Sequence, residues 1–168
     1  MNAKKLAIIN LIFFVVFACS RDNKILVREF ENEFSDSITK HNAKFFAYQY
    51  DGLVPQKSYF IDSKLKFLQY KHGPENGSVE SMVFFDMKTD SLKKIVRRII
   101  YYDWDDERNE RTRNFSDTLY VIQVDKRKTL TYVNNELIDS IFKPKVLDND
   151  KRFIIEMKKQ TEISYNSR

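Results

Sequence analysis

The chain has 168 residues, a length that fits a single domain. Hydrophobic residues make up 42% of it and aromatic residues 14%, which is enough apolar surface to fold, so the composition excludes a disordered chain. The formal net charge is +5, and basic and acidic residues are interleaved along the sequence. Because nucleic-acid-binding proteins gather positive charge on one face or arm, we expect no nucleic-acid partner.

The first eighteen residues have the layout of an export signal. Lys4 and Lys5 give a positively charged start, and residues 6–18 form an apolar run that only Asn10 interrupts. This run is shorter than the stretch of about 20 apolar residues that crosses a bilayer. We therefore expect residues 1–18 to be a signal peptide.

The apolar run ends in Val16-Phe17-Ala18-Cys19, which resembles the lipobox of bacterial lipoproteins. In that family an aliphatic residue, a middle residue and a small residue precede the cysteine, and Phe17 is bulkier than the usual middle residue. The resemblance implies cleavage between Ala18 and Cys19, and attachment of lipid with palmitate-type acyl chains to the Cys19 thiol. The alternatives are an ordinary secretory signal with a chance cysteine and an uncleaved anchor.

Cys19 is the single cysteine, so neither an internal disulfide nor a cysteine-based zinc site can form. We expect residues 19–23 to be a lipidated anchor with a short tether, and residues 24–168 to be one domain. The neutral Ser20 after the cysteine is typical of lipoproteins sorted to the outer membrane. The expected location is therefore the bacterial cell envelope, where the lipid on Cys19 makes the membrane a partner.

Residues 22–41 predict an amphipathic helix, because apolar side chains spaced by four residues share one face. These side chains are Leu26, Phe30, Phe34 and Ile38. Asp22 is a suitable N-cap residue. We expect the apolar face to pack on the core of the domain.

After Asn42, short runs of aromatic and β-branched residues alternate with polar turns, a pattern typical of an antiparallel meander. The predicted strands are residues 44–51, 57–62, 65–71, 78–86, 92–103, 117–125, 129–134 and 136–142. Most links are of hairpin length, and residues 104–116 form the longest one. The alternation within residues 117–125 predicts a sheet with one solvated face.

Residues 151–160 contain good helix formers, and Asp150 could cap a helix that packs Phe153, Ile154 and Met157. A final strand is the alternative for this segment.

Together the elements predict an α+β domain in which the N-terminal helix packs on a curved antiparallel meander of about eight strands, with a C-terminal helix after it. A closed, lipocalin-like β-barrel is the alternative, because about eight strands can close around a small ligand.

Residues 103–110 have the densest group of oxygen ligands in the chain, and calcium prefers several oxygens close together. The segment resembles a calcium-binding loop only in part, because Arg108 replaces the sharp-turn glycine and Asn114 falls at the closing glutamate position. We therefore predict a solvated hairpin tip and no metal site.

The two histidines, His41 and His72, have no catalytic motif around them. The sequence contains no nucleophile elbow, metalloprotease helix or phosphate-binding glycine loop, and it has three glycines in all. We predict no catalytic residue and no cofactor, and hence a protein that is not an enzyme.

Ser91 and Thr118 each follow an aspartate and precede a leucine. This tripeptide resembles the O-glycosylation site of some Gram-negative envelope proteins, which implies sugar on Ser91 and Thr118. The structural alternative is that aspartate and serine or threonine favour the turns before strands.

The sequence thus favours a lipid-anchored envelope protein that binds a protein partner without catalysis. Aromatic residues of the solvated face near Arg97 and Arg98 are candidate contacts, because Tyr, Trp and Arg contribute disproportionately to interface energy. Two alternatives stay open: a carrier of a small apolar ligand in a barrel or a sheet-helix cavity, and a hydrolase that uses scattered acids.

Overall fold

The computed structural model describes residues 22–50, 54–73, 76–105, 107–108, 110–141 and 144–168. The helices are α2 (Lys24–Lys40) and α3 (Pro144–Asn166). The strands are β1 (Lys44–Tyr48), β2 (Gln56–Ile61), β3 (Lys64–His72), β4 (Gly77–Phe85), β5 (Leu92–Asp105), β6 (Glu110–Gln123), β7 (Lys128–Val133) and β8 (Glu136–Ile141).

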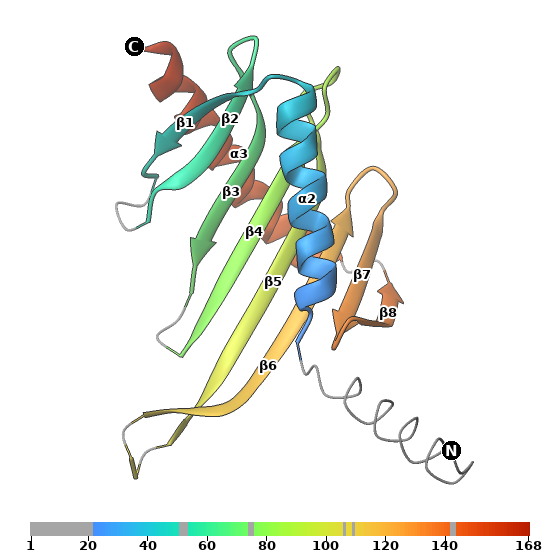
Figure 1. Cartoon of the computed structure of the whole chain (residues 1–168). Helices are drawn as coiled ribbons and strands as arrows, with labels where there is room; N and C mark the ends of the chain where they lie inside the picture. Colours follow the sequence, from blue (N-terminus) through green and yellow to red (C-terminus); the bar gives the residue numbers. More distant parts are fainter. Residues whose placement is uncertain (1–21, 51–53, 74–75, 106, 109, 142–143) are drawn as a thin grey trace, which may run out of the picture.

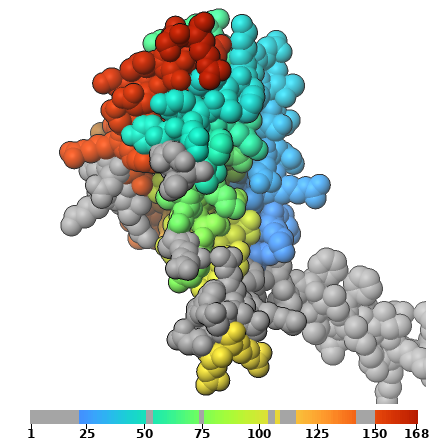
Figure 2. Space-filling model, turned by 90° about the vertical axis from the view of Figure 1, so that its left-hand side faces the viewer, coloured from blue at the N-terminus to red at the C-terminus, as the bar shows by residue number. Residues whose placement is uncertain are grey.

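The eight strands form one antiparallel sheet in which each strand pairs with the next along the chain. α2 lies along one face of this sheet and α3 crosses the other face, so the domain has three layers (Figure 1). Figure 2 shows the same layers from the side, with α2 in blue and α3 in red on opposite sides of the strands. The predicted α+β fold, with the N-terminal helix on an antiparallel meander, is confirmed.

The sheet is open, and β1 and β8 are its two edges. A closed barrel would require β1 to pair with β8, whereas the whole sheet separates them in the strand order. The lipocalin-like barrel is therefore wrong for the described part of the chain.

The predicted solvated face of the sheet is also wrong. Leu119 and Val121 are buried on the α2 face, while Ile122 is buried on the α3 face. Both faces of β6 are covered at residues 119–122, because the chain supplies a helix for each. Solvent reaches the sheet instead at its edges and along the part of the β5–β6 hairpin that projects beyond the helices, where Tyr101 is 47% exposed.

α2 packs on the sheet through Phe34, which is 4% exposed. The Phe34 ring meets Tyr59, Phe67 and Phe84 edge-on, at centroid distances of 5.9, 5.9 and 5.3 Å, which is a preferred geometry for aromatic pairs. Val27 is buried two turns earlier, and Leu26, Phe30 and Ile38 are partly buried against the same cluster. The four-residue spacing therefore predicted the buried face correctly.

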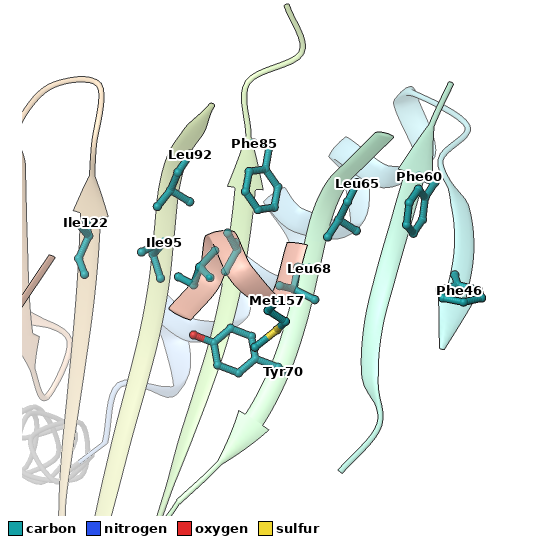
Figure 3. Close-up of a cluster of buried hydrophobic side chains, with 12 residues drawn as sticks. Phe46, Phe60, Leu65, Leu68, Tyr70, Phe85, Leu92, Ile95, Ile122 and Met157 are labelled. Carbon is teal, nitrogen blue, oxygen red and sulfur yellow. The ribbon is translucent and has the colours of Figure 1, made fainter. Parts of the chain in front are cut away.

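α3 buries Ile154 and Met157 against the opposite face. Figure 3 shows apolar side chains from successive strands converging on this helix. The strand residues of this cluster are Phe46, Phe60, Leu65, Leu68, Tyr70, Val83, Phe85, Leu92, Ile95 and Ile122. The Tyr165 ring also stacks on Phe60, with 3.9 Å between centroids. The C-terminal segment is thus a helix, as preferred, and the alternative strand is wrong.

The largest differences from the predicted element boundaries lie in the β5–β6 hairpin and in α3. β5 continues to Asp105 and β6 begins at Glu110, so much of the predicted 104–116 link is paired strand. α3 begins at Pro144, since proline is tolerated in the first turn of a helix. Asp150 therefore lies inside α3 and does not cap it.

Neither helix has the character of a membrane span. Among the described residues, no helix combines the length and the apolar composition that crossing a bilayer requires. Both helices instead serve as covers of the sheet.

Candidate functional site at the β8 edge

β8 exposes three large aliphatic side chains at an edge of the sheet. Leu137, Ile138 and Ile141 are 53, 61 and 57% exposed, in a strand of six residues. An edge strand also offers backbone N–H and C=O groups that can pair with another strand. β8 is therefore a candidate surface for association.

The pairing of β8 with β7 decides which face each side chain occupies. Tyr132 lies opposite Leu137, Thr129 lies opposite Ile141, and a register shift between the two pairs leaves Ile138 as the extra residue. Since paired residues point to the same face, Leu137 extends the α2 face and Ile141 the opposite one. Aliphatic groups therefore flank the edge on both sides, and the bulge at Ile138 adds local twist.

The β7–β8 turn consists of Asn134 and Asn135, with φ values of 54° and 62°. Positive φ at both central residues is the conformation of a two-residue type I′ hairpin, which favours asparagine. The turn fixes the register of β8 on β7. The sequence predicted a short hairpin link at this position.

Asn135 also ties this turn to the start of α2. Its N–H donates to Asn23 Oδ1 at 2.7 Å, and its Nδ2 donates to the carbonyl of Asp22 at 2.8 Å. Asn23 donates its own N–H to Asp117 Oδ2 at 2.8 Å and its Nδ2 to the Asp117 carbonyl at 2.9 Å. Arg98 completes the network with two bonds to the Asp117 carboxylate, of 3.0 and 2.7 Å. We call these five residues the polar clamp.

The polar clamp explains why the predicted capping by Asp22 is wrong. Asn23 holds the N-cap position but makes no side-chain capping bond, because its amide is used by the clamp. Asp22 Oδ1 accepts a long bond of 3.4 Å from the Lys24 N–H. The hydrogen bonds from Arg98 to Asp117 outweigh the effect of burial and raise the pKa of the Arg98 guanidinium, so the guanidinium stays charged.

A groove of about 580 Å³ lies between α2 and strands β3 to β7. Its apolar lining comes from both layers and consists of Phe30, Phe67, Phe84, Phe85, Met87, Val121, Leu130 and Tyr132. The Lys94 ammonium lies 4.2 Å from the centroid of Phe84, a cation–π contact, and pairs with Glu33. Because Tyr132 lies opposite Leu137, the groove adjoins the β8 edge.

The structure does not bring the two histidines together. His41 lines the groove with Glu33 and Asp125, and its ring lies 6.5 Å from that of Phe67. His72 stacks beside Tyr70 instead, at 5.7 Å. Within the described ranges, no three His, Cys, Asp or Glu side chains are grouped to hold a metal ion.

Arg97 and Arg98, predicted beside a binding surface, connect layers of the domain. Arg97 pairs with Asp150 of α3, and its Nη2 donates to the Tyr70 hydroxyl at 3.3 Å. Burial lowers the pKa of Arg97, but Tyr70 and Asp150 outweigh it, so the pKa is raised. The side chains of Arg97 and Arg98 are 11 and 18% exposed, which leaves little of them for a partner.

The two candidate glycosylation residues have different surroundings. Ser91 is exposed between β4 and β5, with its Oγ 2.8 Å from Thr89 Oγ1. Thr118 is half-buried within β6 and pairs with both β5 and β7. Ser91 is therefore the more accessible of the two to a modifying enzyme. Ala18 and Cys19 lie outside the described residues.

The acidic segment 103–110 forms the end of the β5–β6 hairpin. The two strands pair as far as Asp105 and Glu110, and the register shifts between Tyr102 and Trp104. The segment is thus a hairpin end, as predicted, but its turn is much shorter than the predicted link.

The β8 edge is the part of the site that the sequence prediction missed. Its signal was present: the last strand of an open meander is always an edge, and three of the six residues in β8 are Leu or Ile. The prediction placed the binding surface near the two arginines because it assumed one solvated face.

Comparisons of the chain with models of known protein families, with curated proteins and with solved structures give no match. Function is therefore inferred from the edge, the groove and the N-terminal sequence themselves.

Proposed function

We propose that the chain is a lipid-anchored protein of the bacterial cell envelope that binds a protein partner through β8. The lipobox-like sequence ending in Cys19 supports the anchor, and Ser20 supports the outer membrane as its location. The role of the exported domain is binding, with no catalytic step.

The exposed aliphatic edge of β8 carries this proposal. An extended partner segment that adds to β8 gains main-chain hydrogen bonds along the edge. Leu137 and Ile141 would contact its side chains on opposite faces, which adds specificity, because successive residues of a strand point to opposite faces. Burial of one such aliphatic side chain contributes about 1.5 to 3 kcal/mol.

The opposite edge of the sheet offers a natural comparison. β1 has five residues and exposes Phe45, which is 60% exposed. Its neighbour Phe46 is already covered by Tyr165 and by the Arg168 guanidinium, 4.6 Å from the ring centroid. β8 therefore exposes more large apolar side chains than β1 does.

The test replaces one edge residue on each side of the sheet. Ile138→Lys should lower partner recovery after crosslinking in intact envelopes by about tenfold, which corresponds to about 1.4 kcal/mol, because a charged side chain protects an edge from pairing. Phe45→Lys, at the β1 edge, is the matched control and should leave recovery unchanged. Equal recovery with both variants would contradict a β8 interface.

The groove favours a second candidate, a carrier of a small apolar ligand with an anionic head. Its volume of about 580 Å³ lies within the range of small-molecule sites, and Lys93, Lys94 and Lys126 are among its lining residues. Titration with a fluorescent fatty acid should show binding that Lys93→Glu weakens and Lys128→Glu, outside the groove, leaves unchanged. No saturable binding would remove this candidate.

The hydrolase alternative is favoured by one observation, the presence of His41, Glu33 and Asp125 in the same groove. A hydrolase of this kind would lose activity in His41→Ala and retain it in His72→Ala. Hydrolysis that survives in His41→Ala, or that is undetectable in the unchanged protein, would exclude this groove as an active site.

A further inference from the structure

The polar clamp fixes the point at which the chain enters the domain. Asn23 is completely buried and is bonded to β6 through Asp117 and to the β7 backbone through the Tyr132 carbonyl, at 3.2 Å. The tether that precedes it therefore starts from a rigid position on the sheet.

The connection from this point to the proposed lipid is short. Cys19 precedes Asn23 by four residues, and four residues span at most about 14 Å when fully extended. If Cys19 carries the lipid, the clamp cannot lie farther than this from the level of the glyceryl group. One end of the domain must therefore stay close to the membrane.

The β5–β6 hairpin reaches beyond the clamp at this same end. Asp117 pairs with Ile100, and β5 continues for five more residues to Asp105. At about 3.3 Å per residue, this ribbon extends about 17 Å past the clamp, farther than the tether can reach. Figures 1 and 2 show it projecting beyond both helices, while α2 runs from the clamp in the other direction.

The base of the hairpin is braced rather than free to swing. The Tyr102 N–H donates to the Asn76 carbonyl in the β3–β4 turn, at 2.8 Å. Gly77 allows this close approach, because a Cβ there would lie 2.7 Å from the Ile100 carbonyl oxygen. The brace fixes the ribbon beside the point where the tether leaves.

The exposed groups at this end suit a headgroup region. Tyr101 is 47% exposed at the base of the ribbon and Ile25 is 63% exposed in the first turn of α2, while the Lys24 side chain is 76% exposed. Tyrosine and tryptophan are enriched at membrane interfaces, and long lysines reach from apolar surface to water. Residues 103–113 contain five acidic and three basic side chains, which suits a zwitterionic surface better than a strongly anionic one.

We propose that the short tether holds the end of the β5–β6 hairpin against the surface of the bilayer that carries the Cys19 lipid. This inference rests on the proposed lipid anchor. It leaves β8 free to accept a partner strand, because β8 pairs with β7 and β7 pairs with residues 118–123 of β6, on the other side of Asp117 from the hairpin end.

Trp104 provides a specific reporter, because it is the only tryptophan in the chain and belongs to this end of β5. The full chain would be processed and lipidated in cells and reconstituted into vesicles of phosphatidylcholine and phosphatidylethanolamine. A fraction of the phosphatidylcholine would carry bromine close to its headgroup. We expect about a twofold loss of Trp104 emission, since a tryptophan at headgroup level lies within reach of shallow bromines.

Two matched variants test the geometry. An insertion of about 20 Gly and Ser residues between Arg21 and Asp22 lengthens the tether by about 25 Å on average and should restore the emission. In a Trp104→Phe background, Ile163→Trp places the reporter at the far end of α3, on a residue that is 55% exposed, and should show no quenching.

Vesicle flotation tests the lipid anchor separately from the contact between the hairpin and the bilayer. Protein that floats through Cys19 but shows no quenching of Trp104 would overturn the hairpin contact and leave the anchor standing. Quenching that persists with the long tether would overturn the role of the tether. Failure to float, with Cys19→Ala behaving like the unchanged chain, would overturn the anchor and the hairpin contact together.

Discussion

α2 and α3 cover the same sheet but are attached to it in different ways. α2 is held by the aromatic contacts of Phe34 at its centre and by the polar clamp at its first residues, beside the proposed anchor. Its buried polar attachment is thus concentrated at one end, where Asn23 and Asp117 share several bonds, whereas the Glu33 side chain of the Glu33–Lys94 pair farther along α2 is 47% exposed.

α3 is attached along its length. Asp150 pairs with Arg97 near its start, and Lys158 pairs with Asp90 at 3.0 Å farther along. One turn later, Glu162 accepts a hydrogen bond from the Leu65 N–H, at 2.9 Å. We expect one substitution in the buried network of α2 to remove its whole polar attachment. A single substitution among the separate contacts of α3 should weaken its attachment only in part.

The strongest test of this difference is Asp117→Ala. The substitution removes the acceptor of Arg98 and of the Asn23 N–H and leaves an uncompensated, largely buried charge, so we expect a loss of about 3 to 4 kcal/mol in the free energy of unfolding. Urea denaturation measures it. Asp125→Ala, at an exposed position just beyond the other end of β6, should change stability by less than about 0.5 kcal/mol. A loss below about 1 kcal/mol in Asp117→Ala would mean that the clamp is not a unit.

The apolar part of the α3 attachment can be tested with two neighbouring residues. Ile154 is fully buried, whereas Ile155 is 46% exposed. Ile154→Ala should lower the free energy of unfolding by about 2 to 3 kcal/mol through lost burial and a cavity. Ile155→Ala should cost well below about 1 kcal/mol. Equal costs would contradict the placement of α3.

The ionic part of the α3 attachment predicts a dependence on pH. Burial raises the pKa of the Asp90 carboxyl, but hydrogen bonds and charge from Lys66 and Lys158 outweigh it, so the pKa lies below the ordinary 3.8. A lowered pKa stabilises the fold above pH 3.8 and loses this contribution as the pH falls through the lowered value. Asp90→Asn should therefore cost about 1 to 2 kcal/mol at neutral pH and nothing in strong acid.

Asp90→Asn is a clean substitution because Asp90 has a φ of 60°, a conformation that asparagine tolerates. Asp36→Asn, at an exposed position of α2, is the control. As the pH falls, its free energy of unfolding should decrease in parallel with that of the unchanged protein. If the pH curve of Asp90→Asn were parallel as well, this carboxylate would not hold α3.

The smallest effect is expected at the β8 edge. Ile138→Ser should change the free energy of unfolding by less than about 0.5 kcal/mol, because the side chain is 61% exposed and leaves no cavity. Thermal unfolding measures this effect. A loss above about 1 kcal/mol would show that Ile138 belongs to the core and would weaken its role in partner binding.

Most of the fold could be predicted from local patterns. The four-residue spacing around Phe34 predicted the buried face of α2, and the Asn134-Asn135 pair marked the last hairpin. These features depend on near neighbours in the sequence, so they are visible without the tertiary structure.

The missed features depend on long-range pairing. Charged residues made 104–116 resemble a loop, but β5 and β6 pair as far as Asp105 and Glu110, so polarity alone did not separate a loop from a strand. The function of Arg98 as a clamp residue required Asp117 and Asn23 to meet across the fold. Likewise, the exposure of Ile138 follows from the open order of the sheet, which strand patterns do not reveal.

The distance along the chain between Asn23 and Asp117 has a consequence for folding order. These residues are 94 positions apart, whereas every strand pairs with its neighbour in sequence, so the hairpins can form by closing short loops. α2 is synthesised before any strand, yet its docking site is complete only after β6 and β7 have assembled. We expect pulse-labelled hydrogen exchange to show α2 amides protected after those of β2 to β5, which would leave the helix nearest the proposed anchor undocked while the sheet forms beside the membrane.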